Sequence, residues 1–344
     1  MMKTVAVCDH YMKEEFYTDC FAKYDAFDLI ATPYFGPRVR EDMRALAHKI
    51  EHEGAYAVPV PEEVLAVVPE AEVLMVHLCP VTAQLMDSAP NLKYILTNRG
   101  GLENIDVPAA RERGIHVINN PAHNGNAVAE LAICLMICEM RNVQRSFWSI
   151  KNGEWRDKYD NFGRVYEMRN KTVGIIGFGT IGRLVAEKLQ TFRVKVIATD
   201  PNVSPDDPDL ARLNVTLTDP DTLLSTADIV TVHARTEDKH QILGARELDL
   251  IRPEAIFVNT ARAYLVDYDH LAKMLQERRL AGAALEVFPT EPLPSDSPFL
   301  TLDNVSMTNH RGGDPVNCFS DSPEDLVIWL LDHLNGKTPK FLVC

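Results

Sequence analysis

The chain has 344 residues, of which 46% are hydrophobic and 24% are charged, an ordinary composition for a soluble globular protein. This length accommodates two domains with separate cores, because single hydrophobic cores stop growing near about 250 residues. The formal charge of −14 would be repelled by nucleic acid and by anionic membrane surfaces, so we expect neither as a partner.

The first residues of the chain and its cysteines indicate in which cellular compartment we expect the protein. A secretory leader has a basic region, then an apolar stretch, then a cleavage site of small residues, and we do not find this order. We also find no apolar run of roughly 20 residues that could span a membrane. We therefore expect a cytoplasmic protein. The seven cysteines include no C-x-x-C pair, which predicts reduced thiols and no metal site. Cys134 and Cys138 can share a helix face, although burial as small hydrophobes is the simpler interpretation.

Residues 1–118 alternate short apolar runs with amphipathic stretches. The apolar runs predict five strands, at Thr4–Cys8, Phe27–Ala31, Val73–His77, Leu92–Leu96 and His116–Ile118. Helical patterns lie between them, for instance at Arg40–Glu53 and Pro61–Val68. This alternation predicts a parallel α/β domain.

A glycine-containing loop follows the fourth of these strands. Gly100 and Gly101 expose backbone amides beside the cationic side chain of Arg99. Such a loop could hold a carboxylate. A flexible turn with a solvated arginine agrees equally well with the spacing, so both interpretations stay open.

An apolar helix is predicted from Ala127 to about Arg141, after a turn over residues 121–126 in which Asn126 can serve as the helix cap. Apolar residues lie on nearly every side of this helix, so it should be buried all round. It is too short to span a membrane and carries Glu130 and Glu139. We therefore expect it at an inter-domain or subunit interface, and we expect a homodimer.

The stretch from Lys171 to Gly182 combines an apolar run with the spacing G-x-G-x-x-G and leads into a helical pattern. Gly177 permits the tight turn, Gly179 lets a pyrophosphate approach the backbone, and Gly182 allows close packing of the helix on the strand. A second strand, Val194–Thr199, ends on Asp200, where a ribose hydroxyl would be bound. The combination predicts a dinucleotide site, and the alternative is a glycine turn without a ligand.

Five further apolar runs read as buried parallel strands, at Asn214–Leu217, Asp228–His233, Ala255–Asn259, Ala281–Leu285 and Asn304–Thr308. A nucleotide-binding domain therefore spans 119–312. The amphipathic helix Pro323–Leu334 and the run Phe341–Val343 return to the first domain. The substrate domain accordingly comprises 1–118 and 313–344.

Three chemically capable side chains stand just past the carboxyl ends of successive predicted strands: Arg262, Glu291 and His310. Ligand crevices of open parallel sheets lie at those ends. Arginine offers a planar fork for a carboxylate, and histidine can exchange a proton near neutral pH. A nearby glutamate would orient the imidazole and favour its protonated form. Each residue alone could be a solvated surface group, but three placed alike predict a site for moving a hydride and a proton at a 2-hydroxy acid or its 2-oxo form.

Taken together, these motifs resemble the D-isomer-specific 2-hydroxyacid dehydrogenase family, which includes D-3-phosphoglycerate dehydrogenase, glyoxylate/hydroxypyruvate reductase, formate dehydrogenase and D-lactate dehydrogenase. The similarity runs from about Leu92 to His310, through Asn104–Asp106, Gly114–Val117, Ala127–Leu131, Gly177–Gly182, Thr260–Arg262 and Ala281–Phe288. The resemblance implies two doubly wound parallel-sheet α/β domains, a Rossmann NAD-binding domain being inserted into a flavodoxin-like substrate domain. It also implies an NAD-dependent oxidoreductase that interconverts a D-2-hydroxy acid and its 2-oxo acid by hydride transfer.

The resemblance also assigns residues by position. The family's substrate-binding arginine, histidine-orienting glutamate and proton-donating histidine correspond to Arg262, Glu291 and His310. Its carboxylate-binding loop corresponds to Arg99, Gly100 and Gly101. The implied cofactor contacts are Gly177, Gly179, Thr180, Ile181, Gly182, Asp200, His233, Ala234, Thr260, Ala261, Arg262, Glu286, His310 and Gly312.

The chain departs from the family pattern in several places. Glu286 stands where aspartate is common near the nicotinamide amide, and Ala263 replaces a usual glycine. Residues 234–237 replace a proline and apolar residues at the cofactor wall. Arg99 is uncommon in the carboxylate loop and suggests a sugar acid or a phosphorylated acid as substrate. An NAD(H)-sensing binding protein of the corepressor type is the alternative function, because such proteins resemble the enzymes at the same positions.

Overall fold

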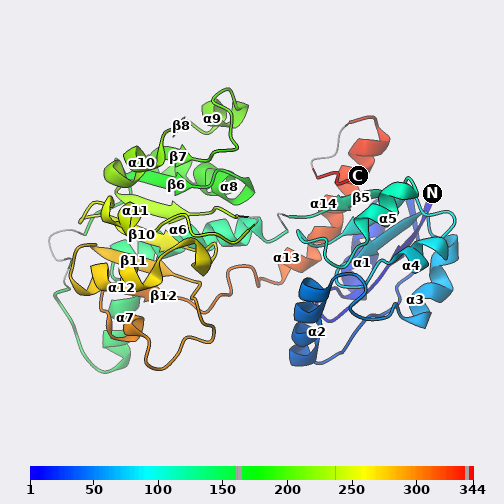
Figure 1. The fold of residues 1–344 in the computed structure, drawn as a ribbon, viewed down its shortest axis with the longest axis horizontal. Helices are drawn as coiled ribbons and strands as arrows, with labels where there is room; N and C mark the ends of the chain where they lie inside the picture. The colour runs from blue at the N-terminus through cyan, green and yellow to red at the C-terminus, as the bar shows by residue number, and fades with distance from the viewer. Residues whose placement is uncertain (122, 160, 162–164, 237, 338–340) are drawn as a thin grey trace. The chain divides into compact units, whose positions relative to one another are not determined.

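A computed structural model describes residues 1–344 except 122, 160, 162–164, 237 and 338–340 (Figure 1). The chain divides into two compact units. Unit 1 comprises Met1–Asn124 and Pro315–Cys344, and unit 2 comprises Gly125–Asp314. Each unit has its own parallel sheet and its own apolar core on both faces of that sheet.

The sheet of unit 1 has five parallel strands in the order β2-β1-β3-β4-β5. This is the flavodoxin-like order, in which the ligand crevice lies at the carboxyl ends of the strands. The strands are β1 (Met2–Ala6), β2 (Phe27–Ala31), β3 (Val73–Val76), β4 (Tyr94–Thr97) and β5 (His116–Asn119). The flavodoxin-like fold expected for this part of the chain is confirmed.

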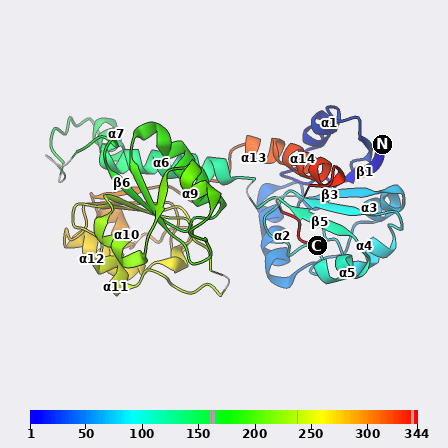
Figure 2. The ribbon, with the colours of Figure 1, turned by 90° about the horizontal axis from the view of Figure 1, so that it is seen from above.

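Helices cover both faces of the unit 1 sheet (Figure 2). One face packs against α1 (Glu14–Phe21) and α14 (Ser322–Leu334), and the other against α2 (Arg40–Glu53), α3 (Glu62–Val67), α4 (Ala83–Asp87) and α5 (Val107–Glu112). The short helix α13 (Asn317–Ser320) precedes α14. The end of the chain returns to this sheet as expected, because Val343 N donates to Val117 O at 2.8 Å.

The sheet of unit 2 has seven parallel strands in the order β12-β11-β10-β9-β6-β7-β8. Counted from β6, this is the doubly wound Rossmann order with one added edge strand. The strands are β6 (Thr172–Ile176), β7 (Lys195–Thr199), β8 (Val215–Leu217), β9 (Ile229–Val232), β10 (Ile256–Asn259), β11 (Gly282–Leu285) and β12 (Val305–Met307). Their buried, non-alternating side chains agree with the continuous apolar runs in the sequence.

Two sets of helices enclose this second sheet (Figure 2). One face packs against α6 (Gly125–Met140) and α8 (Thr180–Leu189), and the other against α10 (Pro220–Thr226), α11 (Ala245–Asp249) and α12 (Tyr268–Gln276). Helices α7 (Val143–Lys151) and α9 (Pro208–Arg212) lie toward the edges. Short 3₁₀ helices are η1 (Val68–Glu70), η2 (Gln190–Phe192), η3 (Ala263–Leu265) and η4 (Pro298–Thr301).

The sequence-based description of α6 needs three corrections. The helix begins at Gly125, so Asn126 lies inside the first turn and does not cap it; Ala122, in the expected turn, lies outside the described residues. Burial all round is wrong for a single chain, which leaves a stripe partly or fully exposed: Glu130, Leu131, Cys134, Ile137 and Cys138. Burial of the thiols is also wrong, because Cys134 is exposed with its Sγ 3.8 Å from that of Cys138.

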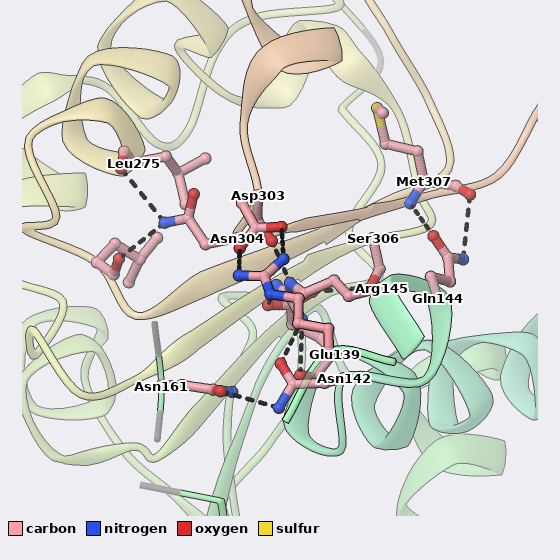
Figure 3. A network of polar contacts seen from close by, with 12 residues as sticks. Glu139, Asn142, Gln144, Arg145, Asn161, Leu275, Asp303, Asn304, Ser306 and Met307 are labelled. Carbon is pink, nitrogen blue, oxygen red and sulfur yellow. Dashed lines mark hydrogen bonds and ion pairs between the residues drawn. The ribbon is translucent and has the colours of Figure 1, made fainter. Parts of the chain in front are cut away.

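A polar network joins the α6–α7 turn to the edge strand β12 (Figure 3). Glu139, which is 2% exposed, accepts a hydrogen bond from Ser306 Oγ at 2.7 Å and forms an ion pair with Arg145. Gln144 pairs with the backbone of Met307, donating to its carbonyl at 3.2 Å and accepting from its amide at 2.9 Å. The network therefore supports the strand that leads to His310.

Among the described residues, no helix is long and apolar enough to cross a membrane. Within the same described residues, no group of three or more His, Cys, Asp or Glu side chains is placed to hold a metal ion.

Candidate active site

The glycine turn after β6 has the geometry that close backbone approach requires. Gly177 has φ +92°, and a Cβ there would lie 2.5 Å from Ala234 N. A Cβ at Gly182 would lie 2.2 Å from Gly177 O, so neither position has room for a side chain. A Cβ at Gly179 would meet no atom of the described chain within 4 Å. The open space beside Gly179 leaves the backbone accessible to a ligand.

Helix α8 begins immediately after this turn. Its N-cap is Gly179, which has no side chain to satisfy the first amides. The first intrahelical bond runs from Arg183 N to Gly179 O at 3.0 Å, so the amides of Thr180 and Ile181 precede the bonded ladder. Free amides at the start of a helix form an anion site, which fits a pyrophosphate.

Asp200 stands at the end of β7, beside the glycine turn. Its Oδ2 accepts a hydrogen bond from Phe178 N at 2.8 Å, and its Oδ1 accepts one from Asn202 N at 2.9 Å. These bonds hold the carboxylate in a fixed orientation while it stays half-buried. Carboxylate oxygens have further lone pairs, so Asp200 can still accept hydrogen bonds from a ribose diol.

The segments that follow β9 and β10 contain buried polar atoms without hydrogen-bond partners among the described residues. His233 Nε2 lies 2.9 Å from Thr231 Oγ1, and burial lowers the pKa of His233 to about 3, so the ring is neutral. His233 Nδ1 and Thr260 Oγ1 are both buried without a hydrogen-bond partner in the described part of the chain. A dinucleotide would offer such atoms donors and acceptors, so the residues present fit NAD.

His310 and Glu291 form a direct pair in unit 2. His310 Nδ1 lies 2.7 Å from Glu291 Oε2, and Glu291 Oε1 accepts from Phe288 N at 2.9 Å. The carboxylate is thus held by the backbone while it orients the imidazole. His310 has φ 54°, in the left-handed region that non-glycine residues rarely adopt. Strained backbone of this kind is typical of functional sites.

Arg262 lies in the loop after β10, and a buried asparagine shapes that loop. Asn259 Oδ1 accepts from Ala261 N at 3.0 Å, and its Nδ2 donates to Arg262 O at 3.1 Å and to Tyr268 Oη at 3.2 Å. The guanidinium of Arg262 is exposed, and its Nη1 donates to Ala261 O at 2.7 Å. Arg262 therefore keeps most of its donors for a ligand.

One open hollow of about 540 Å³ in unit 2 brings Arg262, Glu291 and His310 together. Apolar side chains form part of its wall, including Val266, Val287 and Phe288. A cation, a carboxylate and an imidazole thus converge at the carboxyl ends of β10, β11 and β12, the sheet edge where open α/β folds bind ligands.

Glu286 uses its carboxylate to hold the segment after His310. Its Oε1 accepts from Arg311 N at 2.7 Å and from Gly312 N at 2.5 Å, and burial raises the pKa of this carboxyl. A Cβ at Gly312 would lie 2.7 Å from Glu286 Oε2. The extra methylene relative to aspartate thus lets the side chain reach these two amides, a role that the sequence did not indicate.

The glycine loop of unit 1 offers unpaired backbone donors. The amides of Gly100 and Gly101 make no hydrogen bond with any described residue. Arg99, in contrast, is 9% exposed and its Nη2 donates to Glu51 Oε1 at 2.7 Å. Its charge is therefore already paired, and the loop's capacity for an anion rests on its amides.

Besides the role of Glu286, sequence reasoning missed two features. Asn259 could have been suspected, since a polar residue at the end of an otherwise apolar strand needs buried partners. The pair of Asp9 and His77 in unit 1 left no such signal, because the two residues are 68 positions apart in the chain.

The chain is similar in sequence to one family model and to several dehydrogenases and reductases. The sequence model described as "D-isomer specific 2-hydroxyacid dehydrogenase, NAD binding domain" matches residues 133–312. A glyoxylate reductase of Thermofilum pendens is 33% identical over 297 residues, covering 86% of this chain and 87% of the relative. A D-3-phosphoglycerate dehydrogenase of Archaeoglobus fulgidus is 38% identical over 251 residues, covering 72% of this chain but only 47% of the relative. The chain thus spans about half the length of that relative.

Solved structures agree on the fold. The D-isomer specific 2-hydroxyacid dehydrogenase of Lactobacillus delbrueckii ssp. bulgaricus, in its NAD-complexed form, matches with a TM-score of 0.73 at 20% identity, covering 99% of this chain and 100% of that one. At that identity the likeness concerns the fold alone. The sequence matches and the two sheet orders together lead to one conclusion: this chain belongs to the D-isomer-specific 2-hydroxyacid dehydrogenase family of NAD-dependent oxidoreductases.

Proposed function

We propose that this chain reduces a 2-oxo acid to the D-2-hydroxy acid, and catalyses the reverse oxidation, with His310 as the proton-exchanging residue. The observation that supports this most strongly is the 2.7 Å contact between His310 Nδ1 and Glu291 Oε2 in the hollow that also contains Arg262. An oriented imidazole beside a free guanidinium is the arrangement that a carboxylate-bearing carbonyl substrate needs.

The residues divide the chemistry as follows. NADH, when bound, supplies the hydride that adds to the carbonyl carbon. Arg262 binds the oxygens of the 2-oxo acid and polarises the carbonyl. Since Nδ1 of His310 faces Glu291, Nε2 is the nitrogen that donates a proton to the carbonyl oxygen, which completes the hydroxyl group and leaves a neutral imidazole. Glu291 holds the ring and stabilises its charged form before transfer.

We further propose that unit 2 holds NAD and that unit 1 contributes substrate contacts. The amides of Thr180 and Ile181 would bind the pyrophosphate, Asp200 the adenine ribose, and the wall around His233 and Thr260 the nicotinamide side. The amides of Gly100 and Gly101 would bind the substrate's carboxylate. The unpaired polar atoms at both places support these assignments.

A homodimer and a cytoplasmic location complete the proposal. Helix α7 exposes Phe147, Trp148 and Ile150, with exposed fractions of 62%, 68% and 56%. Large apolar side chains exposed on one helix favour an interaction site, and a second copy of the chain can cover them by twofold symmetry. The cysteines are free thiols, which fits a reducing compartment.

The test is NADH oxidation with a panel of 2-oxo acids, including glyoxylate, hydroxypyruvate and pyruvate, monitored by absorbance. We expect turnover with at least one of them and formation of the D isomer. NADH binding by calorimetry without turnover of any 2-oxo acid would overturn the proposal and favour the NAD(H)-sensing binding protein.

A further inference from the structure

A buried aspartate–histidine pair stands at the carboxyl edge of the unit 1 sheet, and the proposed mechanism does not use it. Asp9 follows β1 and His77 follows β3; they are 2% and 7% exposed, and His77 Nδ1 lies 2.9 Å from Asp9 Oδ2. Asp9 Oδ1 also accepts from the amides of Tyr11 and Met12 at 2.8 and 3.0 Å. Because Nδ1 of His77 is hydrogen-bonded to Asp9, Nε2 is the nitrogen that can bind a ligand.

The electrostatics of Asp9 show that it is ionised at neutral pH. Burial works against the charge, but the charge and hydrogen bond of His77, with the Met12 and Tyr11 amides, leave the pKa of this carboxyl below its usual value. A buried, ionised carboxylate with this set of donors holds the His77 ring in one orientation.

Aromatic rings and a second imidazole surround His77. The ring centroid of His77 lies 5.7 Å from that of Tyr11 and 6.0 Å from that of Phe319. Phe319 in turn lies 6.3 Å from His123. Burial, followed by the charges of His77 and Arg99, lowers the pKa of His123 to about 4. His123 is therefore neutral at physiological pH, and its Nδ1 donates to Asn120 O at 3.2 Å, which leaves Nε2 as an acceptor for a hydroxyl group.

This cluster of Tyr11, His77, His123 and Phe319 adjoins the proposed carboxylate loop. Asn120 N donates to Arg99 O at 2.9 Å, which ties the segment before His123 to the start of the glycine loop. A Cβ at Gly100 would lie 2.8 Å from the Cα of Pro121, so the two loops are in close contact. A substrate whose carboxylate binds the glycine amides would extend its carbon chain next to the cluster.

The charges around the cluster disfavour a second anion on the substrate. Asp9 contributes one carboxylate within the cluster, and Glu51 and Glu103 contribute two more beside Arg99 in the neighbouring glycine loop. The Arg99 guanidinium lies 2.7 Å from Glu51 and 3.7 Å from Glu103, so it is already neutralised. Even a protonated His77 would only balance Asp9. A phosphate would thus meet net negative charge.

Arg38, a cation in the loop after β2, is exposed to solvent, which screens its charge. Its guanidinium stacks 4.3 Å from the centroid of the Tyr34 ring. On α1, Glu14 adds a further acid, and its Oε1 accepts from Thr32 Oγ1 at 2.8 Å. Neutral donors and acceptors are thus what this edge of unit 1 offers to a ligand, together with aromatic faces for C–H groups.

We propose that the cluster of Tyr11, His77, His123 and Phe319 binds hydroxyl groups on the carbon chain beyond C2, so that polyhydroxy acids of sugar type are preferred over phosphorylated acids. This inference rests on the proposed function. The two imidazoles exchange hydrogen bonds with hydroxyl groups, and Tyr11 and Phe319 pack against the C–H faces between them. A site built to bond a hydroxyl group discriminates strongly against an analogue that lacks it.

The first test compares substrates that differ by hydroxyl groups alone. We would measure kcat/KM for NAD reduction with D-glycerate against D-lactate, with D-erythronate against D-2-hydroxybutyrate, and with D-3-phosphoglycerate. We expect the hydroxylated member of each pair to be favoured by roughly 10-fold or more, the value of about one hydrogen bond, and the phosphorylated acid to be poorest. Preference for D-3-phosphoglycerate, or equal values within the pairs, would overturn the inference.

Variants then test the named side chains. His77→Gln keeps an amide donor for Asp9 and His123→Gln alters no buried charge, and each should lower the D-erythronate to D-2-hydroxybutyrate ratio by roughly 10-fold. Phe319→Leu, which removes no charged or hydrogen-bonding group, should lower the same ratio. His52→Gln, on the exposed side of α2, is the control and should keep the parent ratio.

The outcomes separate this inference from the proposed function. If the parent turns over none of these acids, the proposed function itself fails. If the parent oxidises D-lactate and D-2-hydroxybutyrate but the three variants keep the parent ratio, the proposed function stands and the hydroxyl-binding role of the cluster is wrong.

Discussion

His310 combines a strained backbone with a fixed ring, because Glu286 holds the amides that follow it and Glu291 holds its Nδ1. We predict that His310→Gln lowers kcat in both directions by roughly 10²-fold or more, the usual scale for a positioned acid–base group. Fluorescence titration should show nearly unchanged NADH affinity. His270→Gln, on α12 of the same unit, is the control. Near-parent turnover of His310→Gln would exclude it as the proton donor.

Asp200 decides between the two nicotinamide cofactors by charge. Its carboxylate, fixed by Phe178 N and Asn202 N, would accept a bond from the ribose 2′-hydroxyl and repel a 2′-phosphate. We predict that the parent prefers NADH and that Asp200→Ser lowers the NADH to NADPH ratio of kcat/KM by roughly 10-fold or more. Asp206→Ser, an exposed neighbour, should keep the ratio. Arg235 is an exposed cation that would lower the preference if it paired with the 2′-phosphate of NADPH. An equal kcat/KM of the parent with both cofactors would contradict this prediction.

At the scale of elements, the α6–α7 turn stabilises the edge strand β12 through one buried ion pair (Figure 3). Burial raises the pKa of Glu139, although the Arg145 charge and the Ser306 hydroxyl oppose that shift. A carboxylate in this position depends on its partner, since removing one member of a buried pair leaves an uncompensated charge.

We predict that Arg145→Met lowers the free energy of unfolding by about 3 kcal/mol at pH 8. In the folded variant, Glu139 is buried without its cation, so its carboxyl binds a proton more readily than it does in the parent. This loss should therefore shrink as the pH falls toward about 4.3. Urea unfolding of both proteins at pH 8 and pH 5 measures the difference. Arg156→Met is the control, because its pair with Asp303 is about one-third exposed and should contribute about 1 kcal/mol or less. A loss independent of pH would contradict the role of Glu139.

At the scale of the whole molecule, the apolar faces of α6 and α7 predict self-association. Phe147 and Ile150 lie near one another on α7, and Trp148 adds to the same exposed surface. We predict that the parent has twice the 38.6 kDa mass of one chain by light scattering at micromolar concentration. The double variant Phe147→Glu/Trp148→Glu should be a monomer, because a charge in the apolar centre of an interface is costly. Ile328→Glu, at an exposed position of α14, should keep the parent mass; a monomeric parent would refute the dimer.

The sequence by itself determined the two sheets, the nucleotide turn and the family. Short continuous apolar runs between turns indicate buried strands of a parallel sheet, and the spacing of the glycines at 177, 179 and 182 marks the nucleotide turn, although the atom that excludes a Cβ at Gly177 belongs to Ala234. The positions of Arg262, Glu291 and His310 after successive strands followed from the same alternation, since parallel strands end at one edge. Local periodicity and backbone sterics suffice for such features.

Only the tertiary structure decided what the polar side chains do. Arg99 appeared to be a free cation in the sequence, yet Glu51, 48 residues away, pairs with it. Glu286 bonds amides 25 and 26 residues further on, and Asp9 finds His77 across 68 residues. Hydrogen bonds and ion pairs act over about 3 Å between groups that any chain length can separate, so no local pattern encodes them. The same holds for α6, whose exposed stripe depends on which neighbours the fold supplies.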